Sequence, residues 1–127
     1  MQLKTVGVYR EMYSGRHDEL PSIFESYGDH VIEDRQRVLD YLDAAPGVFD
    51  VLDVLTDVIN NTDQILSASS LVSDGTWIWR VDSAHYLRRH DLDIPDDFLR
   101  HVRDRNYQPP KEIDYTAEFE SAMLAYF

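Results

Sequence analysis

The stretch "QILSASSLVSDGTWIWRV", residues 64–81, decides the fold, because it has the pattern of two short strands joined by a tight turn. Strand-favouring residues stand on both sides of Asp74-Gly75, and an Asp-Gly pair readily adopts the positive φ angles of a hairpin turn. Successive side chains of a strand point to opposite faces, so Trp77 and Trp79 share one face and Ile78 lies on the other. We therefore predict a β-hairpin whose tryptophan face packs into the core and whose Ile78 face is half covered. Arg80 is expected to pair with Asp82 or Asp74.

Helical patterns flank this hairpin. Residues 29–47 predict a helix that opens at Asp29 or His30 and ends at the "APG" of 45–47. Its apolar stripe consists of Val31, Ile32, Val38, Leu39 and Leu42. Glu33 precedes Arg37 by four residues, the favourable order for an ion pair on a helix. Residues 82–110 predict two short helices, the first capped by Asp82 or Ser83 and the second beginning near Pro95.

Residues 48–61, "VFDVLDVLTDVINN", fit two structures. Strict alternation fails, which favours a helix with Asp50, Asp53 and Asp57 on one wet face. The many Val, Ile and Phe residues favour the alternative, a short buried strand followed by a turn.

The segments together predict one α+β domain, with a short antiparallel sheet around the 64–81 hairpin packed against several helices. The globular part spans residues 1–110. Residues 111–127 form a helical tail in which Phe119, Met123 and Phe127 share a face. The tail is expected either to dock on the domain or to pair with another chain as a homodimer through 115–127.

Three pieces of the sequence resemble a group of small bacterial proteins typical of GC-rich actinobacteria: "TVGVYRE" (5–11), "LPSI" (20–23) and the run from Ser70 to Arg103. In that group a Ser- or Thr-Asp-Gly is followed by Trp-x-Trp, a Tyr-containing helix and a helix that opens with Pro-x-x-Phe. The resemblance covers residues 3–110 in outline and is specific around 71–102. It implies this order of segments and no established activity.

Charge and composition restrict the classes of function. Twelve basic residues stand against twenty-four acidic ones, which gives a net charge of −12. Such a charge repels phosphate backbones, so nucleic-acid binding is not expected, and it attracts a basic protein partner. Acidity that only serves solubility, or that adapts the protein to high salt, is the alternative. The chain has no cysteine, no signal-peptide pattern and no apolar run that could span a membrane, so we expect a cytoplasmic protein without a membrane partner.

Residues with the chemistry of a reactive site are few. His85 and His90, with Asp91 and Asp93, form the only compact group suited to metal binding, and His101 is the candidate for a further ligand. However, His85 and His90 stand five residues apart and do not share a helix face well. The alternative metal site is therefore His85, His90, Asp91 and His101. No nucleophile motif or phosphate-binding loop is present, so we expect no cofactor and no catalytic residue. Tryptophan, tyrosine and arginine contribute most of the binding energy in protein interfaces. We therefore predict a partner-binding surface that consists of Trp77, Trp79, Arg80, Tyr86 and Arg89. Their alternative role is to fill the core.

These features favour a non-catalytic protein-binding module, comparable to immunity or antitoxin proteins, that neutralises or regulates a basic partner. The first alternative is a small metal-binding protein or enzyme that uses the histidine group. The second is an assembly subunit that oligomerises through the C-terminal helix.

Overall fold

A computed structural model describes all residues, 1–127, as one α+β domain, which confirms the predicted fold class. A four-stranded mixed sheet has the order β1-β6-β5-β2, with β1 parallel to β6 and the other pairs antiparallel. A separate two-stranded ribbon pairs β3 with β4. The strands are β1 (Lys4–Thr5), β2 (Gly47–Phe49), β3 (Val54–Thr56), β4 (Gln64–Leu66), β5 (Leu71–Ser73) and β6 (Trp77–Arg80). The helices are α1 (Arg35–Ala44), α2 (Val81–Arg89), α3 (Asp96–Asp104) and α4 (Ala117–Leu124).

The predicted hairpin is present as β5 and β6, with Val72 opposite Trp79 and Ser73 opposite Ile78. Within the Asp74-Gly75 pair only Gly75 has a positive φ, +95°. The Asp74 carboxylate closes the turn by accepting hydrogen bonds from the amides of Thr76 and Trp77, at 3.0 and 2.8 Å. The turn is therefore fixed by two properties of the Asp-Gly pair, an accepting side chain and a permissive backbone.

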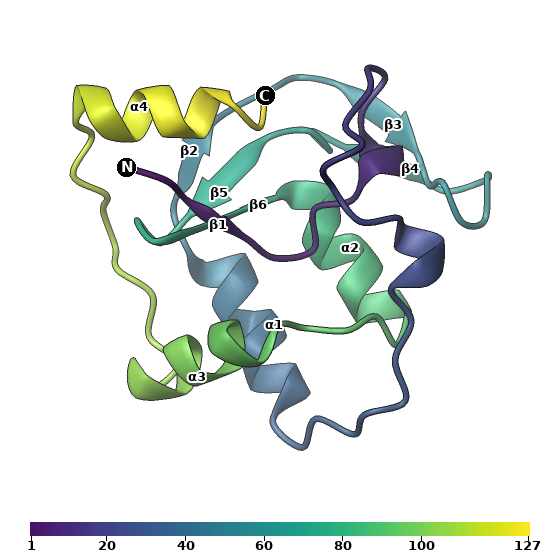
Figure 1. The fold of residues 1–127 in the computed structure, drawn as a ribbon, viewed down its shortest axis with the longest axis horizontal. Helices are drawn as coiled ribbons and strands as arrows, with labels where there is room; N and C mark the ends of the chain where they lie inside the picture. The colour runs from purple at the N-terminus through teal and green to yellow at the C-terminus, as the bar shows by residue number, and fades with distance from the viewer.

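Helices cover both faces of the sheet (Figure 1). Trp77 and Trp79 pack against the apolar sides of α1, α2 and α3 in the larger core, where Phe98 of α3 lies edge-on to both rings. Ile78 faces the opposite way and packs with Leu3, Leu71, Phe119 and Met123 in a smaller core under α4. Ile78 is completely buried, so the expectation of a half-covered face is wrong. The helix of the C-terminal tail is what covers this face.

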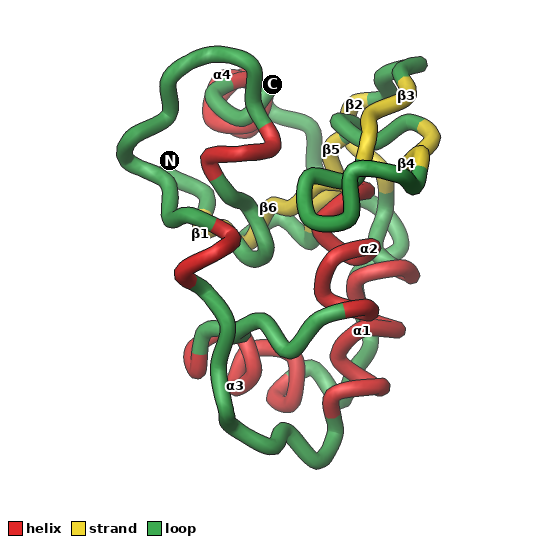
Figure 2. Tube along the Cα trace, turned by 90° about the vertical axis from the view of Figure 1, so that its right-hand side faces the viewer, coloured by secondary structure: helices red, strands yellow, loops and turns green.

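The first long helix is shorter than predicted. α1 begins at Arg35 and not at Asp29 or His30, and Val31 is 90% exposed in the loop before it. Val38, Leu39 and Leu42 are buried as expected. The Arg35 guanidinium donates hydrogen bonds to the carbonyls of Leu87 and His90 at the end of α2, so a tertiary contact holds the start of the helix. Figure 2 shows α1 lying beside α2.

Residues 48–61 are not helical, which corrects the preferred prediction and favours its strand alternative. The segment contains the end of β2, then β3, then a turn. Asp57 does not lie on a wet face, because its side chain is fully buried, and Asp53 is half-buried. Only Asp50 of the three is exposed.

The two short helices predicted over 82–110 are present as α2 and α3. α2 follows β6 without a loop, and Arg80, not Asp82 or Ser83, occupies its cap position. The Ser83 hydroxyl accepts a hydrogen bond from the Arg80 amide, at 3.0 Å. None of the helices has the length and apolar composition needed to cross a bilayer.

Candidate functional site: an acidic groove beside α3

An open groove of about 810 Å³ lies between the loop before α1 and the start of α3. Its lining combines apolar residues with several carboxylates. The lining residues are His30, Val31, Ile32, Glu33, Asp34, Asp93, Ile94, Pro95, Asp96, Leu99, Arg103 and Tyr107. A concave surface with an apolar floor and a few charged groups is the default candidate for a binding site.

One wall of the groove is a polar cluster around Asp34. Arg103 of α3 donates two hydrogen bonds to the Asp34 carboxylate, at 2.8 and 2.7 Å, and the Tyr107 hydroxyl donates a third, at 2.6 Å. These bonds hold the pKa of Asp34 well below its usual value. The Arg37 guanidinium stacks on the Tyr107 ring, 3.7 Å from its centre. This wall is therefore pre-formed and its charges are mutually satisfied.

The opposite wall is held by a short contact between two loops. Tyr27 and Leu92 form an isolated β-bridge, and the amide of Asp93 donates to the carbonyl of Ser26, at 2.8 Å. A Cβ atom at Gly28 would lie 1.7 Å from an oxygen of the Asp93 carboxylate. Glycine at this position therefore leaves room for the Asp93 side chain, which is exposed at the groove.

The charges at the rim are mostly uncompensated. Glu33 and Asp96 are exposed and take part in no ion pair, and Asp93 has only His30 nearby, at 3.7 Å. The predicted ion pair between Glu33 and Arg37 does not form, because Glu33 precedes α1 and is not on its surface. The rim thus presents three carboxylates without an arginine or lysine partner.

The apolar part of the groove comes from Ile94 and Leu99, both buried, and from Ile32, which is half-buried. Val31 projects beside them, almost fully exposed. Sequence reasoning missed this site because it assigned Val31 and Ile32 to a helix stripe. The acidic run "DLDIPDD" (91–97) was the available signal, but its position opposite residues 31–34 is a tertiary feature.

Four of the five predicted partner-binding residues cannot meet a partner, which corrects that expectation. Trp77, Trp79, Arg80 and Tyr86 are all buried, with at most 3% of each residue exposed. The tryptophans fill the core, as in the alternative role considered for them. Only Arg89 is exposed.

Arg80 forms a buried ion pair with Asp82, one of the two partners predicted for it. Its Nε and Nη2 atoms donate to the two carboxylate oxygens at 3.0 and 2.9 Å. Its Nη1 donates to the carbonyl of Met12, and its guanidinium lies over the Tyr13 ring. This network connects β6 and α2 to the N-terminal segment.

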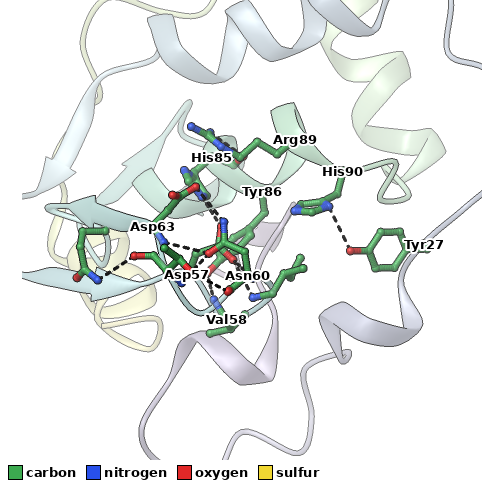
Figure 3. Close-up of polar contacts among 12 residues, drawn as sticks. Tyr27, Asp57, Val58, Asn60, Asp63, His85, Tyr86, Arg89 and His90 are labelled. Carbon is green, nitrogen blue, oxygen red and sulfur yellow. Dashed lines mark hydrogen bonds and ion pairs between the residues drawn. The ribbon is translucent and has the colours of Figure 1, made fainter.

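The histidines are distributed among separate contacts (Figure 3). His85 Nε2 lies 2.7 Å from Asp57, whose other oxygen accepts hydrogen bonds from the amides of Ile59 and Asn60. Burial by itself raises the pKa of Asp57, but the hydrogen bonds from His85 and these amides outweigh it and lower the pKa. His90 is 3.3 Å from the Tyr27 hydroxyl.

His101 lies elsewhere, with Nε2 2.7 Å from the buried carboxylate of Asp74, which also accepts a hydrogen bond from Tyr41 at 2.6 Å. The metal-binding group of His85, His90, Asp91 and His101 is therefore not assembled, and no three metal-competent side chains converge anywhere in the chain. The His85 and His101 pairs attach α2 to the 57–60 turn and α3 to the hairpin turn.

Comparison of the chain with protein-family models, with curated proteins and with solved structures finds no match.

Proposed function

We propose that this protein is a binding module that holds a positively charged, partly apolar segment of another protein in the groove beside α3. The observation that carries the proposal is the combination of an apolar floor with three rim carboxylates, Glu33, Asp93 and Asp96, that lack a lysine or arginine partner. An uncompensated charge at the rim favours a ligand of opposite sign and accelerates the encounter.

The pre-formed walls support the proposal. Ordering a binding surface on association costs free energy, and the bonds around Asp34 and the Tyr27–Leu92 bridge already hold this groove in place. The net charge of −12 adds long-range attraction for a basic protein. A module of this kind would neutralise or regulate a basic partner in the manner of immunity or antitoxin proteins.

A titration with a synthetic amphipathic peptide of leucine and lysine tests the proposal, with affinity measured by calorimetry and the contact residues located by NMR amide shifts. We expect shifts at residues 30–34, at 93–96 and along α3. The double variant Glu33→Gln/Asp96→Asn keeps the shape of the rim and removes two charges, so it should weaken binding by about tenfold or more.

The matched control is Glu118→Gln/Glu120→Gln, which removes the same charge from the exposed side of α4. It should leave the affinity nearly unchanged. Equal weakening by both double variants would mean that the peptide senses only the net charge, and the groove would then lose its role.

A further inference from the structure

Residues 50–57 form an extended segment that directs two aspartates toward the domain and two apolar residues toward solvent. Exposed and covered residues alternate strictly from Asp50 to Asp57. The outward positions are Asp50, Leu52, Val54 and Thr56, of which Leu52 and Val54 are 97% and 54% exposed. The inward positions are Val51, Asp53, Leu55 and Asp57. In an ordinary half-buried strand the apolar residues would face inward.

The inward carboxylates have structural partners. Asp53 accepts hydrogen bonds from the hydroxyl and amide of Ser69, at 2.5 and 3.3 Å. Asp57 is held by His85 and by two backbone amides of the following turn. Because side chains alternate along a strand, contacts that hold Asp53 toward the domain place its neighbours Leu52 and Val54 on the outside.

The outward apolar residues form a patch on the ribbon. Leu66 of β4 lies directly across from Val54 of β3 and is 72% exposed. The ribbon lies apart from the four-stranded sheet and at the far end of the molecule from α3 (Figure 1). No contact within the domain therefore uses Leu52, Val54 and Leu66 as core, and together they make an exposed apolar surface.

The outer edge of β3 is open for backbone pairing. The amide of Ser67 donates to the carbonyl of Asp53, and the amide of Asp57 donates to that of Asp63. Hydrogen-bonded pairs alternate along an antiparallel ladder, so Leu55 with Ile65 is the next such pair, and the backbone groups of Val54 and Thr56 point away from β4. These groups make no hydrogen bond to any turn, loop or other strand.

Two exposed aspartates next to the patch, Asp50 and Asp63, take part in no ion pair. Residues 38–79 contain no lysine, arginine or histidine. Of the seven aspartates in this range, Asp40 and Asp43 pair with Arg88, Asp57 pairs with His85 and Asp74 pairs with His101. An incoming strand of positive charge is attracted by Asp50, by Asp63 and by the net charge of −12, whereas a second copy of this acidic chain would be repelled.

We propose that the outer edge of β3 is a second docking site, which adds an extended, positively charged strand of a partner protein to the β3–β4 ribbon. The backbone groups of Val54 and Thr56 pair with the incoming strand. Its apolar side chains cover Leu52, Val54 and Leu66, and its basic side chains approach Asp50 and Asp63. Addition of a strand to an open sheet edge is a general mode of peptide recognition, in which backbone bonds give affinity and alternate side chains give selectivity.

The test uses a short capped peptide in which valine and lysine alternate, and a second copy of it methylated on alternate backbone nitrogens. We expect the unmodified peptide to shift the amide resonances of residues 50–56. The methylated peptide has the same charge but cannot pair with an edge, so it should bind at least about tenfold more weakly. The variant Leu52→Thr/Val54→Thr keeps strand-favouring side chains, removes the apolar patch and should weaken binding to a similar degree.

Two controls separate this site from other surfaces. Phe24→Ser changes an apolar residue that is 56% exposed in a different part of the chain, and it should leave the affinity unchanged. Glu33→Gln/Asp96→Asn, which disables the groove beside α3, should also have no effect on this peptide. Equal binding of the methylated peptide would overturn the proposal, because attraction would then be electrostatic alone. Concentration-dependent dimerisation that Val54→Thr abolishes would overturn it too, because the edge would then serve a second copy of the chain.

Discussion

At the scale of single residues, the interior of this protein contains three aspartates, and each has a different environment. Asp57 and Asp74 accept several hydrogen bonds, which lower the pKa of both carboxyls despite the opposing effect of burial. Asp82 has one charged partner, Arg80, and burial raises its pKa to about 6. Every buried side-chain nitrogen and oxygen has a hydrogen-bond partner. These carboxylates therefore specify contacts between distant segments.

The substitution Asp74→Asn should reduce the free energy of unfolding near neutral pH and have less effect at acidic pH. The Asp74 pKa is lower in the folded state than in the unfolded chain, so its contribution is present above about pH 4 and is lost as the pH falls through the folded pKa. Asp74→Asn removes the charge that Tyr41 and His101 face, at a cost of about 2–3 kcal/mol near neutral pH. Urea unfolding of both proteins over the acidic range should show the difference narrowing below about pH 4. The exposed Asp18→Asn serves as control, and a difference independent of pH would contradict the assignment.

Substituting Asp82 tests the buried ion pair. Asp82→Asn leaves the Arg80 guanidinium buried without a counter-charge, so we expect a loss of about 3–5 kcal/mol in the free energy of unfolding. The double variant Arg80→Met/Asp82→Leu removes both charges and should lose less of the free energy of unfolding.

The effect of pH on the stability that Asp82 provides has the opposite sign to that of Asp74. Because the folded pKa of Asp82 is raised, protonation of this carboxyl favours the folded state. The stabilisation that this proton binding gives is fully present below about pH 4 and is lost as the pH rises through about 6. A double variant less stable than the single one would contradict this account.

At the scale of elements, the sheet depends on α4 to cover its second face. Phe119 and Met123 are both almost fully buried against Leu3 and Ile78. The N-terminal strand β1 and the C-terminal helix therefore belong to one small core, although they stand at opposite ends of the chain. The apolar face of α4 is thus occupied within the chain.

Truncating Phe119 should destabilise the whole domain. Phe119→Ala leaves a cavity between α4 and the sheet, and we expect it to reduce the free energy of unfolding by about 3–5 kcal/mol. Phe127→Ala, on a side chain that is 62% exposed, should change it by about 1 kcal/mol or less. Guanidinium unfolding followed by tryptophan fluorescence measures both, since Trp77 and Trp79 lie in the core. Similar losses in the two variants would show that α4 contributes little to this core.

At the scale of the whole molecule, charge is the dominant feature. The net charge of −12 is spread over a small domain. The fourteen residues from Asp91 to Asp104 include five aspartates, Asp91, Asp93, Asp96, Asp97 and Asp104, and only two arginines, Arg100 and Arg103. Self-repulsion of this kind opposes the compact state. The two proposed docking surfaces both lie where such charge is uncompensated.

Salt should stabilise the protein. Raising NaCl from about 10 mM to about 0.5 M shortens the screening length from about 30 Å to a few Å, which reduces the repulsion between surface carboxylates. We expect the melting temperature to rise over this range, as measured by circular dichroism. A variant with Asp50→Asn, Asp63→Asn and Asp96→Asn should show a smaller rise, because these exposed aspartates have no ion-pair partner. A melting temperature that falls with salt would mean that ion pairs outweigh repulsion.

The sequence by itself determined the features that depend on neighbouring residues. The hairpin follows from the local chemistry of Asp74-Gly75, and α2 and α3 follow from apolar spacing interrupted at Pro95. The same local reasoning failed for residues 48–61, where the partners that turn Asp53 and Asp57 inward are Ser69 and His85, on segments that become neighbours only after folding.

Tertiary structure alone decided where the candidate surfaces lie. The contact of Arg35 with the end of α2 sets the start of α1. Val31 and Glu33 therefore lie in the preceding loop, where they line the groove. The groove itself exists because residues 30–34 and 93–96, which are distant in sequence, line the same hollow beside the start of α3. A pattern of residues along the chain records which side chains prefer burial, but the hydrogen bonds and charges that compete with that preference come from residues distant in sequence.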